Sequence, residues 1–119
     1  MNFVKYSDVV TDSGIQHACK LAVKARYYYD RDEKASHKAE FDFMNDKITE
    51  EEYKTIQNRK KLSYDDYYIA LRFLEAIFNA RENNYTLDVH CVNEEDEIYT
   101  IEDEDSNSIF FLGKYDAWV

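Results

Sequence analysis

The spacing of apolar residues changes once along the chain, near Tyr85, and this change constrains the fold more than any other feature. Before it, apolar side chains recur every three or four residues, as on the buried face of a helix. From Tyr85 onward they alternate with polar side chains, as in half-buried strands. The sequence has no proline and only two glycines, which argues against a loop-rich fold. It therefore predicts an α+β architecture, with helices covering one face of a sheet.

The part of the chain before residue 84 is expected to form about four helices. Ser13 with Gln16, and Thr49 with Glu52, have the spacing of a capping box, in which a side chain and the backbone exchange hydrogen bonds where a helix begins. The helical spacing weakens at residues 29–32, where we expect a break. These signals divide the region into separate helical segments.

The last of the four expected helices has the most complete apolar face. Ser63 can cap it, and Asn83–Asn84 can end it, because asparagine tolerates the left-handed conformation of a helix C-cap. One face of it comprises Tyr67, Tyr68, Leu71, Leu74, Ile77, Phe78 and Arg81. Ile69 and Phe73 widen this face, so we expect a central helix packed against the sheet.

Three segments with the two-residue period follow, at residues 85–92, 97–102 and 108–112. The short polar connections between them are typical of an antiparallel meander. The complete expectation is α+β, with about four N-terminal helices packed on a C-terminal three-stranded antiparallel meander. We expect a single domain over residues 1–119, because two domains would each lack a sufficient core.

Negative charge is concentrated in the C-terminal part. The chain has 25 acidic and 15 basic residues, a net charge of −10. Residues 88–119 hold 10 of the acids and one base, Lys114, which gives this part a net charge of −9. Such a surface repels nucleic acid and anionic membranes, which argues against either as a direct partner. The asymmetry indicates a dedicated interaction surface instead.

Two acidic runs on the predicted strands and turns are the candidate partner-binding site. They comprise Glu94, Glu95, Asp96, Glu97, Glu102, Asp103, Glu104 and Asp105, with Tyr99 between them as an aromatic anchor. The expected partner is a basic nucleic-acid-binding protein or nuclease complex. If the acidic runs are not the interface, the tyrosines at 27–29 and 64–68 are the next candidates.

No catalytic motif is present, and we predict neither an enzyme nor a cofactor. His17, Cys19, His90 and Cys91 lack zinc-site spacing, and the apolar context of both cysteines predicts core thiols rather than metal ligands. The segment 103–107 begins like a calcium loop, but Ser108 and Lys114 stand where such a loop needs glycine and glutamate, so only a weak calcium site stays open. Few cysteines, no signal peptide and no long apolar run predict a cytoplasmic location.

Taken as a whole, the sequence resembles small acidic phage-encoded inhibitors, such as anti-CRISPR and antirestriction proteins. The resemblance rests on the chain length, the runs 94–97 and 102–105, and the 11 tyrosines. It implies an inhibitor that blocks a host defence enzyme by DNA mimicry or by occupying its basic groove. The alternatives are a non-catalytic acidic adaptor or antitoxin-like module that binds a basic protein, and a domain made acidic only for solubility.

Overall fold

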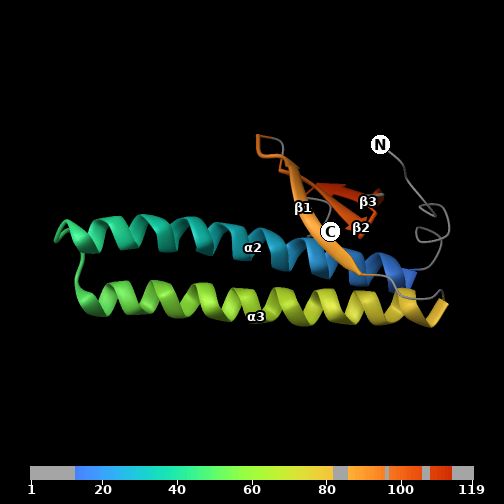
Figure 1. Ribbon diagram of the computed structural model, residues 1–119, viewed down its shortest axis with the longest axis horizontal. Helices are drawn as coiled ribbons and strands as arrows, with labels where there is room; N and C mark the ends of the chain where they lie inside the picture. The colour runs from blue at the N-terminus through green and yellow to red at the C-terminus, as the bar shows by residue number, and fades with distance from the viewer. Residues whose placement is uncertain (1–12, 82–85, 96, 106–107, 114–119) are drawn as a thin grey trace.

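A hairpin of two long helices and a small antiparallel sheet make up the fold (Figure 1). The computed structural model describes residues 13–81, 86–95, 97–105 and 108–113. In chain order, the elements are α2 (Ser13–Met44), α3 (Glu50–Arg81), β1 (Leu87–Asn93), β2 (Ile98–Asp103) and β3 (Ser108–Gly113). The protein is therefore α+β. None of its described helices is both long and apolar enough to cross a membrane.

The expected architecture of four helices packed on a meander is wrong, because α2 and α3 are continuous helices of 32 residues each. The predicted break at residues 29–32 lies inside α2, where Asp32 is buried against the neighbouring helix. Ser63, the predicted cap, lies within α3 and donates its hydroxyl hydrogen bond to Asp32. Ser36 likewise donates to Gln57 across the hairpin, at 3.0 Å. Asp32 and Ser63, which suggested helix ends, thus form a cross-link between the two helices.

The capping box at the start of α3 is confirmed. The Glu52 backbone N–H donates to the Thr49 hydroxyl at 3.1 Å, and the Thr49 N–H donates to the Glu52 carboxylate at 3.2 Å. At the end of α2, the Asn45 side-chain amide donates to the Phe41 carbonyl at 2.8 Å. Asp46 then adopts a φ of 58°, the left-handed conformation that lets the chain reverse. The turn between the helices is therefore closed by its own side chains.

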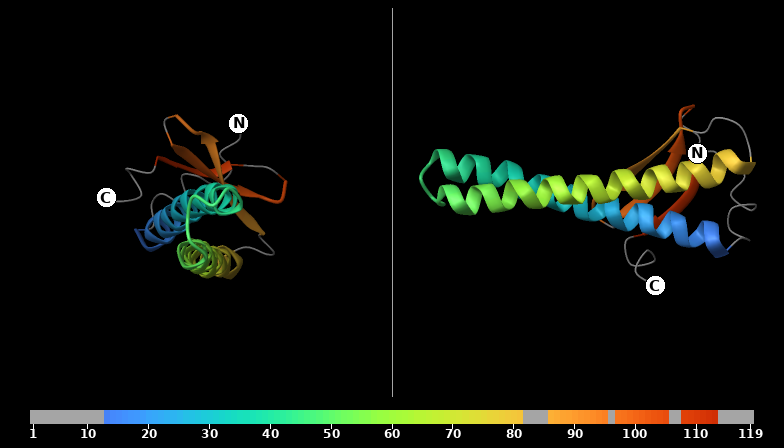
Figure 2. Two further views of the ribbon diagram at one scale, coloured as in Figure 1. Left: turned by 90° about the vertical axis from the view of Figure 1, so that its left-hand side faces the viewer. Right: turned by 90° about the horizontal axis from the view of Figure 1, so that it is seen from below.

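The sheet has the strand order β1-β2-β3, with antiparallel pairing throughout. Val89 lies opposite Ile101 and Cys91 opposite Tyr99, so these residues share one face of the sheet. Figure 2 shows this sheet lying over α2, with α3 on the other side of α2. The first strand is also fastened to α3, because the Leu87 N–H donates to the buried Glu75 carboxylate at 2.8 Å.

The apolar core lies at one end of the hairpin, where the sheet covers it (Figure 1). Its buried members are Ile15, Ala18, Cys19, Ala22, Val23, Tyr67, Leu71, Leu74, Leu87, Val89, Tyr99 and Ile101. Leu71 and Leu74 are buried as predicted and Ile77 is half-buried against the core, but Tyr68, Ile69 and Phe73 are exposed and do not belong to the core face. The predicted core side chain Phe78 and the predicted cap Asn83–Asn84 lie outside the side chains that the structure describes.

Candidate functional site

The two acidic runs lie at opposite ends of the sheet. Residues 94–97 connect β1 to β2, whereas the run 102–105 closes β2 and enters the turn to β3. Successive turns of an antiparallel meander fall at opposite ends, and β2 has six residues. At about 3.4 Å per residue, the two turns are separated by roughly 17 Å. The structure therefore does not gather the predicted site into one cluster.

Four of the eight predicted acidic side chains nevertheless are exposed to solvent. The exposed ones are Glu94, Glu95, Glu104 and Asp105, and the half-buried ones are Glu97, Glu102 and Asp103. Asp96 lies outside the described residues. Within the part of the chain that the structure describes, Glu94, Glu95 and Glu104 form no ion pair. Their charge is available to a partner.

Tyr99 does not present its ring at this surface. Its side chain is 3% exposed and belongs to the core beneath the sheet. Burial raises the pKa of its hydroxyl above the ordinary tyrosine value, because the anionic form would lose its hydration. Tyr99 therefore supports the strand that carries the acids and is not an aromatic anchor.

A polar network that the sequence does not reveal joins the sheet to both helices. The Tyr67 hydroxyl donates to the Asp88 carboxylate at 2.7 Å, and the Val89 N–H donates to the same carboxylate at 2.9 Å. Arg26 lies over the Tyr67 ring, 5.2 Å from its centroid, and 3.8 Å from Asp88. Burial, ahead of the Asp88 hydrogen bond, raises the pKa of Tyr67 to about 12. The network fixes the position of β1 on the helices.

His90 lies between two carboxylates on the sheet, those of Asp88 and Glu102. Its imidazole lies 3.3 Å from Asp88 and 3.4 Å from Glu102, which face each other across β1 and β2. Asp88 lies outside both acidic runs, and only the pairing register brings it beside Glu102. The acidic surface of the 102–105 end therefore extends onto β1.

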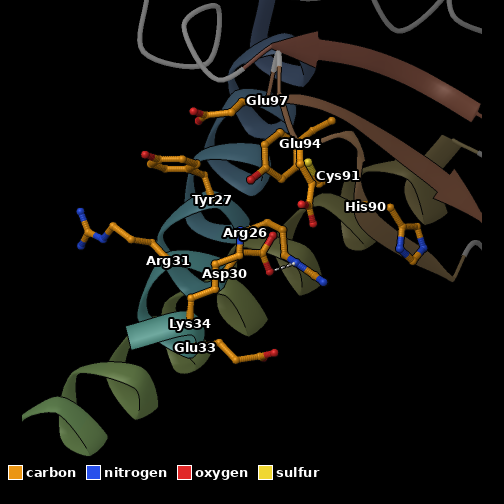
Figure 3. Close-up of a pocket in the computed structure, with 11 residues that line it drawn as sticks. Arg26, Tyr27, Asp30, Arg31, Glu33, Lys34, His90, Cys91, Glu94 and Glu97 are labelled. Carbon is orange, nitrogen blue, oxygen red and sulfur yellow. Dashed lines mark hydrogen bonds and ion pairs between the residues drawn. The ribbon is translucent and has the colours of Figure 1, made fainter. Parts of the chain in front are cut away.

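A pocket of about 480 Å³ separates the first acidic turn from α2 (Figure 3). Glu94 and Glu97 line it from the sheet, whereas Arg31 and Lys34 line it from the helix. Within it, Arg26 is already paired with Asp30 at 2.9 Å, as the dashed line in Figure 3 marks. The mixed charges of this lining favour neither a free anion nor a free cation. The bases of the lining partly offset the charge of the 94–97 turn.

The cysteines do not suggest a reactive centre. Both thiols are free, with Cys19 buried and Cys91 half-buried. Burial raises the pKa of the Cys19 thiol to about 12, which disfavours the nucleophilic thiolate. Among the residues that the structure describes, no three histidine, cysteine, aspartate or glutamate side chains converge as a metal site.

Comparisons with protein-family models, with curated proteins and with solved structures find no match to this chain. Its function must therefore be inferred from its own surfaces.

Proposed function

We propose that this protein is a non-catalytic acidic inhibitor that occupies the basic groove of a nucleic-acid-binding enzyme. The observation that carries the proposal is the exposure of Glu94, Glu95 and Glu104 without ion-pair partners in the described part of the chain. Acids placed only for solubility would be spread over the surface, whereas residues 88–119 hold a net charge of −9.

The sheet suits this role because it presents exposed acidic side chains at both of its ends. The core beneath the sheet and the network of Tyr67, Asp88 and Arg26 hold these carboxylates on a rigid frame. A basic groove would attract such a surface at long range, with an association rate that falls as salt increases.

Both ends of the sheet have basic side chains beside their acids. Arg31 and Lys34 line the pocket that Glu94 borders. At the other end, Asp88 lies 3.8 Å from Arg26 and 3.3 Å from His90. We therefore expect the exposed acids of both ends to contribute to binding.

The test begins with a pull-down from a bacterial lysate and identification of the captured protein. Its affinity is then measured at several salt concentrations for the parent and for Glu94→Gln/Glu95→Gln/Glu104→Gln/Asp105→Asn. Each exposed charge contributes about 0.2 to 1 kcal/mol, so the four together should weaken binding roughly fourfold or more at low salt, with a shallower salt slope. The matched control removes four exposed acids of the helices, through Glu40→Gln, Glu50→Gln, Glu51→Gln and Asp65→Asn. It should bind like the parent.

The second candidate function is an acidic adaptor that binds a basic protein without imitating DNA. A competition experiment on the same complex distinguishes it from the inhibitor. The mixed charges around the first acidic turn favour this candidate, because a phosphate-like surface needs no bases. Duplex DNA added as a competitor should displace the inhibitor from its target, whereas an adaptor would stay bound. If the sheet variant binds as tightly as the parent at low salt, the acidic surface is not the interface in either case.

A further inference from the structure

An apolar groove of about 710 Å³ runs between α2 and α3, and all of its lining residues come from these two helices. Large apolar side chains in it are open to solvent: Leu62 is 64% exposed, Ile69 66% and Phe73 57%. Leu21 and Tyr28 face them from α2. Contiguous exposed apolar side chains of this kind mark an interaction site more often than isolated ones do.

This groove is distinct from the core. On α3, the core residues Tyr67, Leu71 and Leu74 follow one another at helical spacing. Ile69 is two residues from Tyr67, a rotation of about 200° around the helix, which directs it away from that face. The helix thus carries two apolar stripes, of which the fold uses one.

The rim of the groove is basic, in contrast to the chain as a whole. Lys24, Arg31 and Arg59 line it, opposed by the exposed Asp66 and by Asp32, which is buried and paired with Arg31 and Ser63. Lys24 and Arg59 have no ion-pair partner among the described residues. Arg31 also stacks on Tyr28, with its guanidinium 4.7 Å from the ring centroid. Positive charge therefore borders an apolar floor.

We infer that this groove binds an acidic amphipathic helix of a partner protein. A helix laid between α2 and α3 would place apolar residues at i, i+4, i+7 and i+11 on the floor and carboxylates against Lys24 and Arg59. From Leu62 to Phe73 the groove extends for 11 residue steps. At 1.5 Å each, this length is about 16 Å, or three helical turns of the partner.

Charge and shape argue against two other occupants. A two-fold contact between copies of this chain would bring the same basic rims together, which is unfavourable. An anionic membrane is flat and would contact the ridges of the two helices rather than the floor between them. The inference concerns the side of the hairpin away from the sheet and is independent of the proposed inhibition.

The experiment uses a fluorescein-labelled amphipathic peptide of about 18 residues, with leucines at the floor positions and glutamates beside them. A second peptide has glutamine in place of each glutamate, because a lysine peptide would also bind the acidic sheet. Fluorescence anisotropy with the full chain should show the acidic peptide binding at least about tenfold more tightly than the neutral one. Lys24→Glu/Arg59→Glu should abolish this preference.

The floor is tested with Ile69→Ser/Phe73→Ser, whose folding is checked by circular dichroism. Both residues are exposed, so the fold should persist while peptide affinity falls at least about tenfold. The matched control, Phe41→Ser/Val92→Ser, removes two exposed apolar side chains away from the groove and should bind like the parent. Equal binding of both peptides, or unchanged binding by the floor variant, would overturn the inference.

Two further results would assign the face to another occupant. A dimer of the parent in sedimentation, dissociated in the floor variant, would make the groove a contact between copies. Flotation of the parent, but not of the floor variant, with phosphatidylserine-containing vesicles would make it a membrane surface. Either result overturns the proposed helix.

Discussion

At the scale of single residues, the two thiols differ in their surroundings and should differ in reactivity. Cys19 has no exposed surface and its pKa is raised to about 12 by burial, whereas Cys91 is half-buried at the pocket edge. At neutral pH a disulfide reagent such as DTNB should modify one thiol in the native protein and the second only after denaturation. Because burial keeps the Cys19 thiol protonated, it should stay unmodified in the native protein when the pH is raised to 9.

Cys91→Ser provides the control for this prediction. The variant should show almost no reaction before unfolding, and Cys19→Ala should react like the native parent. Fast modification of Cys91→Ser at neutral pH would mean that Cys19 is reached through frequent opening of the core.

The position of Tyr99 shows why the residue-level site was only partly predictable. Ile98 and Ile101 are both apolar, yet they lie three positions apart and cannot share a strand face. The alternation therefore allowed two inward faces. One contains Ile98 and leaves Tyr99 outside, and the other contains Tyr99 and Ile101. The pairing of Cys91 with Tyr99 and of Val89 with Ile101 selects the face that buries the tyrosine. The same register places Asp88 beside Glu102, which the chain order does not indicate.

At the scale of elements, the start of α3 depends on the capping box of Thr49 and Glu52. Thr49→Ala removes the hydroxyl that accepts the Glu52 N–H, and should lower the free energy of unfolding by about 1 kcal/mol, as measured in denaturant melts. Thr55→Ala is the matched control, because the Thr55 hydroxyl only donates to the Glu51 carbonyl within the helix. It should change stability by less than about 0.5 kcal/mol. Equal effects of both variants would show that the cap does not hold the turn.

That cap was predictable because all of its atoms lie within four consecutive residues. The continuity of the helices was not, because it depends on pairs such as Ser63 with Asp32, 31 residues apart in the chain. In an isolated segment, serine and aspartate compete with helical hydrogen bonds, and so they indicate an end. In this hairpin the other helix provides the hydrogen-bond partner, as Asp32 does for the Ser63 hydroxyl. Ile69 and Phe73 were wrongly predicted to widen the core face. Apolar spacing alone does not show whether a helix face is buried or exposed.

At the scale of the whole molecule, the hairpin is much longer than the sheet that covers it. The longest dimension is 52 Å, and Figure 1 shows the sheet against only one half of the helices. The fully buried large side chains Leu74, Val23, Val89 and Ile101 belong to that half. Toward the turn, the buried residues are the small or polar Asp32, Ser36 and Ala39, while Phe41 and Met44 are exposed.

This uneven core predicts uneven local stability. Small buried side chains remove little apolar surface from water, so the turn end of the hairpin should open without unfolding the rest. In hydrogen–deuterium exchange followed by mass spectrometry, peptides from residues 36–57 should exchange at least about tenfold faster than peptides from 67–74 and 87–93, a difference of about 1.4 kcal/mol in opening free energy. Leu74→Ala should accelerate exchange mainly in the covered half, because it leaves a cavity there. Equal protection along both helices would show instead that the hairpin unfolds as one cooperative unit, held at its turn end by polar cross-links such as Ser36 with Gln57.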